Sequence, residues 1–199
     1  MQDTRVDVIR HGEPLGGRRY RGHGVDDPLS PAGWEQMRQA LGGRPHWDQI
    51  LSSPMRRCRL FASALAQRHA LPLAIDPAFR EIGMGAWEGR LHAEVAATEP
   101  DRLAVFQRDP VGGRPPGAEP LAVFLARIAD AYERQIAAYP GRRLLIVCHA
   151  GVTRAILGHV MRADPERWSR IRIDHAGISR IRAGRFAPSV EFVNRRSLE

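Results

Sequence analysis

Apolar positions along the chain first alternate with polar ones and then form short continuous runs. Thr4 to Arg10 (TRVDVIR) alternates and then becomes apolar, and Leu144 to Cys148 (LLIVC) is apolar throughout. Runs of this length that are rich in Val, Ile and Leu are typical of buried strands. Two shorter runs, Gln49 to Ser52 and Leu73 to Ile75, predict two further strands.

Segments with helical spacing lie between these predicted strands. Pro31 to Leu41 begins behind Ser30 as N-cap, and Met55 to His69 and Val152 to Met161 each follow a strand and a short loop. Apolar side chains in Pro120 to Tyr139 also recur at helical spacing. Strands that alternate with helices predict an α/β fold, a three-layer α/β/α sandwich whose central sheet is mostly parallel.

The remaining segments predict strands near the end of the chain and two long loops. The strands are Ile171 to Asp174, Ile178 to Ile181 and Val190 to Asn194. Leu15 to Pro28 and Arg108 to Pro120 fit neither a helix nor a strand. Because long loops in a compact domain are usually functional, we expect residues 15–23 and 108–119 to form the walls of a ligand pocket.

Length and composition indicate a single soluble domain. The 199 residues, of which 43% are hydrophobic, suffice for one core, which we expect over residues 1–197, with Leu198 and Glu199 as an expression-vector remnant. No apolar run approaches the roughly 18 residues of a membrane span. Cys58 and Cys148 form no CxxC pair, which argues against a disulfide framework and against a zinc site. We expect a cytoplasmic protein without a membrane partner.

The net charge of +8 raises the question of a nucleic-acid partner. All 30 cationic residues are arginine, and they are spread along the chain instead of clustered. Solvated arginines, with a few in a phosphate pocket, explain this charge better than a nucleic-acid surface does, so we expect no nucleic-acid partner.

Histidines and arginines follow three of the predicted strands. Arg10 and His11 follow the first strand, Arg57 lies just after another, and His149 follows LLIVC. In an open parallel sheet the ligand site lies outside the carboxyl ends of the strands, so these side chains converge on one crevice. Guanidinium groups bind phosphate with paired hydrogen bonds, and a neutral imidazole is a nucleophile that needs neither a metal nor a cofactor.

A leaving alkoxide also needs a proton donor, for which Glu81 is the candidate. It lies in a Gly-rich loop close to Trp87, which we expect to give it apolar surroundings, while Gly12 and Gly151 let the backbone approach the ligand. Each residue alone has a simpler interpretation, such as a hydrogen-bonded core histidine or a carboxylate in a surface ion pair. The prediction rests on the whole set.

Five segments resemble, in order, the signature elements of the histidine phosphatase (phosphoglycerate-mutase-like) superfamily. The resemblance runs from residue 8 to about residue 157. The segments are Arg10–Glu13 (RHGE), Ser52–Arg57 (SSP-L-x-R), Phe79–Gly89 (L-x-E…G-x-W-E-G), Pro116–Glu119 (P-x-G-E-S) and Val147–Gly151 (V-S-H-x-G).

This resemblance implies a phosphoglycerate-mutase-like fold and a role for each matching residue. His11 is then the nucleophile that forms a phosphohistidine, Arg10, Arg57 and His149 bind the phosphoryl group, and Glu81 donates the proton. His149 counts among the catalytic residues, and no metal is implied.

The sequence departs from the family pattern at several positions. Pro14 and Pro120 each replace a hydroxyl residue, and Cys148 replaces the Ser before the second histidine. The Asn usual after RHGE has no clear counterpart, which leaves Arg21 as a substitute substrate contact; Glu119 is a second substrate contact by the resemblance.

Residues 17–22 and 27–34 are similar to the corresponding parts of alpha-ribazole phosphatases. This likeness implies hydrolysis of a small phosphorylated metabolite, alpha-ribazole 5′-phosphate of cobalamin biosynthesis. A phosphoglycerate mutase-like enzyme or a sugar phosphatase of the same superfamily is the alternative, although the compact length favours a phosphatase over a mutase. The oligomeric state stays open, with a homodimer as one option.

Two other readings of the sequence remain. Cys148 to Arg154 fits C-x-x-G-x-x-R, the phosphate loop of cysteine-dependent phosphatases, but Val147 and Ala155 differ from that pattern and the other motifs stay unexplained. A non-catalytic phosphate-binding module would not need both histidines and Glu81.

Overall fold

The computed structural model describes residues 3–43, 46–184 and 187–198. Within them a sheet of six strands has the order β3-β2-β4-β1-β5-β6. The first four pair in parallel, and β5 and β6 are antiparallel to their neighbours, so the prediction of a mostly parallel sheet is confirmed. The strands are β1 (Thr4–Arg10), β2 (Gln49–Ser52), β3 (Leu73–Ile75), β4 (Arg143–Cys148), β5 (Ile178–Ala183) and β6 (Ser189–Arg195).

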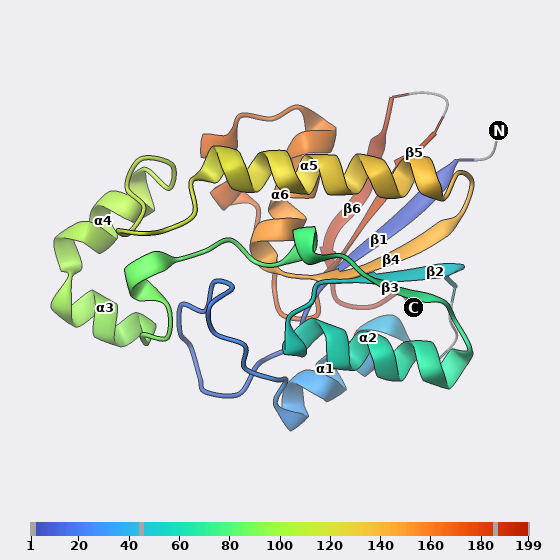
Figure 1. Ribbon diagram of the computed structural model, residues 1–199, viewed down its shortest axis with the longest axis horizontal. Helices are drawn as coiled ribbons and strands as arrows, with labels where there is room; N and C mark the ends of the chain where they lie inside the picture. Colours follow the sequence, from blue (N-terminus) through green and yellow to red (C-terminus); the bar gives the residue numbers. More distant parts are fainter. Residues whose placement is uncertain (1–2, 44–45, 185–186, 199) are drawn as a thin grey trace.

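Helices cover both faces of this sheet, as Figure 1 shows. One face carries α1 (Pro31–Leu41) and α2 (Arg56–His69), and the other carries α5 (Leu121–Ala138) and α6 (Ala150–Met161). Two separate clusters of buried apolar side chains fill the two interfaces, because the central strands are buried on both faces. The predicted three-layer sandwich is therefore confirmed.

The predicted elements begin and end close to where the structure has them. Ser30 is the N-cap of α1, and its hydroxyl oxygen accepts a hydrogen bond from the Gly33 N–H at 3.0 Å. The strand expected at Ile171 to Asp174 is wrong. The carbonyl groups of Ile171 and Ile173 accept hydrogen bonds from Arg154 and Arg10 instead of joining the sheet.

A small unit beside the sandwich was not predicted. It consists of η2 (Gly85–Trp87), α3 (His92–Thr98) and α4 (Pro100–Arg108), with a cluster of buried residues around Trp87. Residues 15–28 join it through backbone hydrogen bonds, including an isolated bridge between Arg19 and Leu91. The long loop thus connects β1 to this unit and borders the space between them.

Short 3-10 helices complete the fold at η1 (Pro77–Phe79) and η3 (Pro165–Arg170). Leu198 packs on the α1 side of the sheet, and its N–H donates to the Ala40 carbonyl at 3.1 Å, while Glu199 lies outside the described residues. No helix of the described residues has both the length and the apolar character needed to span a membrane.

Candidate active site

A cavity of about 330 Å³ opens where the four parallel strands end. Arg10, His11, Arg21, Arg57 and Glu81 all line it, so five of the seven predicted site residues share one space. His149 is fully buried directly behind the cavity, with its ring centroid 5.2 Å from that of His11. Glu119, the seventh, is not among the lining residues.

The His11 ring is neutral and has a defined tautomer. Its Nδ1 lies 2.7 Å from the Gly12 carbonyl oxygen, which only accepts hydrogen bonds, so the proton is on Nδ1 and the lone pair is on Nε2. Burial, followed by the charges of Arg57 and its neighbours, lowers the pKa of His11 well below its usual value. A neutral imidazole with a free Nε2 is the reactive form of a histidine nucleophile.

His149 is held by two side chains through its ring nitrogens. Arg57 Nε donates to Nδ1 at 3.3 Å, which leaves the proton on Nε2, and Nε2 donates to the Ser53 hydroxyl oxygen at 2.7 Å. Burial, and then Arg57 and Arg10, lower the pKa of His149. Sequence reasoning gave Ser53 no role, although it lies inside the recognised Ser52–Arg57 segment.

Arg57 is a buried cation and Arg10 a half-buried one, and neither forms an ion pair with a carboxylate of the described residues. Arg10 Nη1 donates to the Ile173 carbonyl at 2.7 Å, and its buried Nε has no partner within the described ranges. Desolvation by burial lowers the pKa of Arg10 to about 10. Arg57 donates to the carbonyl groups of Val25 and Gly22, both at 2.9 Å. No carboxylate of the described residues lies within ion-pair distance of either guanidinium, so the pair favours an anion in the cavity.

The Glu81 carboxylate is fixed at the cavity wall by two backbone N–H groups. Gly151 donates to Oε2 at 3.2 Å, and Ile82 donates to Oε1 at 3.0 Å. A Cβ on Gly151 would lie 2.3 Å from Oε1, so glycine makes room for this carboxylate. Gly12 is needed because a Cβ there would lie 2.1 Å from the Gly33 carbonyl oxygen. Contacts within the protein therefore require glycine at both positions, and Gly151 also lines the cavity.

Trp87 does not supply the apolar surroundings that were expected for Glu81. The Trp87 ring packs against Tyr20 at 5.0 Å and Phe106 at 5.4 Å between centroids, and its Nε1 donates to Glu99. It therefore builds the small helical unit and does not line the cavity.

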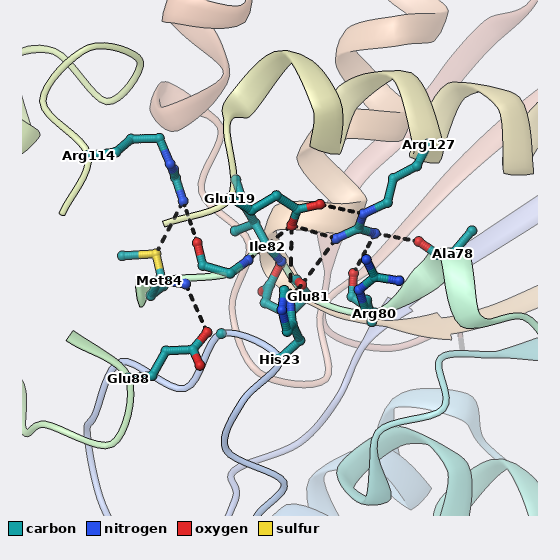
Figure 2. Close-up of polar contacts among 12 residues, drawn as sticks. His23, Ala78, Arg80, Glu81, Ile82, Met84, Glu88, Arg114, Glu119 and Arg127 are labelled. Carbon is teal, nitrogen blue, oxygen red and sulfur yellow. Dashed lines mark hydrogen bonds and ion pairs between the residues drawn. The ribbon is translucent and has the colours of Figure 1, made fainter. Parts of the chain in front are cut away.

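Glu119 and Arg127 form a partly buried ion pair that supports the Glu81 loop (Figure 2). Arg127 holds both carboxylate oxygens and also donates to the carbonyl groups of Ala78, Arg80 and Glu81. Glu119 Oε2 accepts the Gly83 N–H at 3.1 Å. The loop that carries Glu81 is therefore attached to the beginning of α5.

Arg21 reaches the cavity but is already engaged by its own loop. It forms an ion pair with Asp27 at 2.9 Å and donates to the carbonyl groups of Leu15 and Gly17. These bonds close residues 15–27 into a compact loop.

The Cys148 thiol points away from the cavity. It belongs to the buried cluster under α5 and α6, contacts the Thr153 hydroxyl at 3.6 Å, and its pKa is raised to about 12 by burial. A thiol of this kind does not ionise near neutral pH, which removes the support for a cysteine nucleophile.

Further residues line the cavity beyond the individually predicted ones, and Tyr20 and Arg114 among them lie in the segments 15–23 and 108–119 that were expected to form its walls. Arg154 is fixed by a hydrogen bond from Nε to the Ile171 carbonyl at 2.8 Å, and His175 lies next to His11. The only sequence signal for Arg154 was its place in the C-x-x-G-x-x-R pattern. Apolar side chains form the outer wall: Tyr20, Ile82, Met84, Phe106, Leu121, Phe124 and Trp168. No group of three or more His, Cys, Asp or Glu side chains suited to a metal was found among the described residues.

Comparison with protein families gives a match over almost the whole chain. The model of the histidine phosphatase superfamily (branch 1) matches residues 6–196. A bifunctional protein of Mycobacterium tuberculosis is 32% identical over 181 residues, covering 88% of this chain and 49% of that protein. The chain thus spans about half the length of the curated relatives it matches first.

Two phosphatases match over nearly their full length. A glucosyl-3-phosphoglycerate phosphatase of Mycobacterium tuberculosis is 27% identical over 206 residues, covering 96% of this chain and 91% of that one. The crystal structure of the alpha-ribazole phosphatase from Shigella flexneri has a TM-score of 0.83 at 24% identity and covers 98% of both chains, a likeness in fold.

Proposed function

The chain belongs to the histidine phosphatase superfamily, and from this premise we propose that it hydrolyses phosphomonoesters through a phosphohistidine at His11. One observation carries the proposal. A neutral His11 with its lone pair on Nε2 shares a cavity with the half-buried Arg10 and the buried Arg57, neither of which has an ion-pair partner among the described residues. A phosphoryl dianion supplies the missing negative charge and the electrophile together.

The reaction proceeds in two steps that use the same side chains. His11 Nε2 forms a bond to phosphorus while the bond between phosphorus and the ester oxygen breaks, and Glu81 gives its proton to that oxygen, so the alcohol leaves. Water then attacks the phosphohistidine, the Glu81 carboxylate takes a proton from it, and the N–P bond breaks to release inorganic phosphate. Arg10 and Arg57 balance the charge of the phosphoryl group throughout.

The other predicted site residues take supporting roles in this proposal. His149 completes the phosphoryl site, because Arg57 and Ser53 fix its ring 5.2 Å from that of His11. Arg21 and Glu119 act on the substrate through the loops they hold, since their own polar groups are engaged by Asp27 and Arg127.

We propose alpha-ribazole 5′-phosphate, and hence a place in cobalamin biosynthesis, as the first candidate substrate. The apolar outer wall supports it, because a flat aromatic leaving group can pack against Tyr20, Phe106 and Trp168. The likeness of residues 17–22 and 27–34 to such enzymes supports the same candidate. Both cysteines are free and buried, which fits a reducing compartment such as the cytoplasm.

A sugar phosphate or phosphoglycerate ester is the second candidate. Arg19 and Arg154 line the same cavity, and neither has a carboxylate within ion-pair distance among the described residues. They favour a leaving group that carries further oxygen atoms or a carboxylate. A similar phosphatase from Mycobacterium tuberculosis is named for such an ester.

A panel of phosphate esters tests the proposal and ranks the candidates. The wild type is expected to turn over p-nitrophenyl phosphate, with kcat/KM highest for alpha-ribazole 5′-phosphate among natural esters. His11→Ala should abolish both turnover and labelling by a phosphorylated substrate, whereas Cys148→Ser should keep most of the activity. The label should be acid-labile and stable in base, as a phosphoramidate is. An inactive Cys148→Ser together with an active His11→Ala would refute the mechanism.

A further inference from the structure

A third histidine lies beside the proposed nucleophile. The ring centroid of His175 is 5.7 Å from that of His11, at an interplanar angle of 38°. His11 therefore stands between two imidazoles, those of His149 and His175. His175 lines the cavity of the candidate active site and also a neighbouring hollow, which shares Arg10, Arg19 and Arg154 with it.

The turn that carries His175 is bonded directly to the end of β1. Ala176 N–H donates to the His11 carbonyl at 3.3 Å, and Arg10 N–H donates to the Gly177 carbonyl at 3.1 Å. Any movement of this turn therefore also affects the backbone of the nucleophile. The position of His175 relative to His11 is fixed by the main chain.

Asn194 of β6 holds the same turn from its other side. Its side chain accepts the Asp174 N–H at 2.7 Å and donates to the Asp174 carboxylate at 3.1 Å. Ala176 and Asn194 both have a φ of 56°, a left-handed conformation that costs free energy in residues other than glycine. A Cβ on Gly177 would lie 2.2 Å from Asn194 Oδ1. Strained backbone of this kind persists where the surrounding contacts fix it, and here it presents His175 to the cavity.

The imidazole of His175 has no hydrogen-bond partner among the described residues, and its ring lies beside that of His11. It is half-buried. The charged groups that act on it are Arg10, Arg18, Arg21 and Asp174. Burial, followed by these arginines, lowers the pKa of His175 to about 4, so the ring is neutral near pH 7 in the free protein.

We propose that His175 is a third imidazole of the phosphoryl site, which contacts the phosphoryl group bound at His11 and becomes cationic as that group binds. This inference rests on the proposed function, since it uses the same phosphoryl site. A phosphoryl group attached to His11 Nε2 extends into the cavity that both rings line. Because the centroids of the His11 and His175 rings are 5.7 Å apart, its oxygen atoms come within hydrogen-bond reach of His175. The negative charge of the bound dianion offsets the positive charge of the surrounding arginines. It therefore favours uptake of a proton from the solvent by His175.

Sulfate binding tests this inference without requiring turnover. Sulfate stays a dianion from mildly acidic to neutral pH, so protons taken up on binding go to the protein. Calorimetric titrations in two buffers with different ionisation enthalpies give both the affinity and the number of protons. We expect His175→Asn to weaken sulfate binding about tenfold, the loss of one charge-assisted hydrogen bond. It should also take up about one proton fewer than the wild type.

The matched control is His69→Asn at the far end of α2, which should bind sulfate as the wild type does. In the wild type, the NMR signal of the His175 Cε1–H should move to the position of a charged imidazole when sulfate saturates the site. Because His175→Asn could disturb the turn, thermal melting and His175→Ala serve as a second comparison. The inference is overturned if both variants stay folded and bind sulfate within twofold of the wild type, or if the NMR signal does not move. Turnover of p-nitrophenyl phosphate by the wild type tests the proposed function separately.

Discussion

Replacing Arg57 with methionine tests whether one buried charge keeps the site histidines neutral. After burial, Arg57 is the largest cause that lowers the pKa of both His11 and His149. Without its charge, the pKa of each ring rises towards the usual histidine value. Since neutral His11 is the reactive form, protonation then begins at a higher pH, and the acid limb of kcat/KM moves upward.

The size of this shift follows from Coulomb's law. At an effective dielectric constant of about 20, a unit charge about 5–6 Å away contributes about 3 kcal/mol, equivalent to about two pH units. Reorientation of nearby polar groups after the charge is removed offsets part of this change, so we expect the acid limb to move by about one to two pH units. Loss of the paired hydrogen bonds to the phosphoryl group should lower kcat/KM at the optimum by about 100-fold.

The assay is the pH profile of kcat/KM for p-nitrophenyl phosphate in three variants. Arg57→Lys keeps the charge but not the planar fork, so it should raise KM while its acid limb stays near that of the wild type. Arg56→Met is the matched control, because Arg56 is the exposed neighbour on α2. An acid limb of Arg57→Met that coincides with the wild-type limb would refute the electrostatic reasoning.

Three other predictions follow from the site. Glu81→Gln should slow alkyl esters about 100-fold and p-nitrophenyl phosphate much less, because nitrophenolate leaves without a proton; Glu13→Gln is the control, and equal losses for both esters would remove Glu81 from the acid role. Turnover should be undiminished by EDTA, since arginines carry the phosphate charge, and loss on chelation with recovery on adding Mg²⁺ or Zn²⁺ would contradict this. His11 and His149 bind protons less readily in the folded protein than in the unfolded chain, so acidification favours unfolding. Urea titrations should therefore show stability falling between about pH 7 and pH 5, by about 1.4 kcal/mol per pH unit below about 6.5 for each histidine, and an unchanged midpoint would contradict the pKa directions.

The strands of the parallel sheet could be predicted because their sequence pattern follows from burial. Thr4 to Arg10, Gln49 to Ser52 and Leu73 to Ile75 agree with β1, β2 and β3 at both ends. The same pattern was misleading at Ile171 to Asp174, where apolar and polar residues alternate outside any sheet. Alternation indicates which side chains are buried, and it does not indicate which groups form hydrogen bonds with the backbone. In this segment the backbone carbonyl groups accept hydrogen bonds from Arg154 and Arg10.

The helices α3 and α4 lacked the signal that made the other helices predictable. Val95 is the one buried residue of α3, and in α4 the partly buried Leu103 and Phe106 pack against the cluster around Trp87, so each helix contributes few side chains to a core. Both helices depend on contacts between separate parts of the chain. These contacts are the cluster around Trp87 and the backbone hydrogen bonds of this unit to residues 15–28.

The candidate site could be predicted as a set of residue types, while its chemistry depends on pairs that are distant in sequence. His149 takes its tautomer from Ser53, 96 residues away, and from Arg57, 92 residues away. The Glu81 loop depends on Arg127, whose bonds to Ala78, Arg80 and Glu81 span 46 to 49 residues. No local pattern encodes such distances, because hydrophobic periodicity fixes the face of an element and not the partner of one polar atom. His175 illustrates this limit, since it belongs to no recognised motif and reaches the cavity only because the turn at residues 174–177 is bonded to the end of β1.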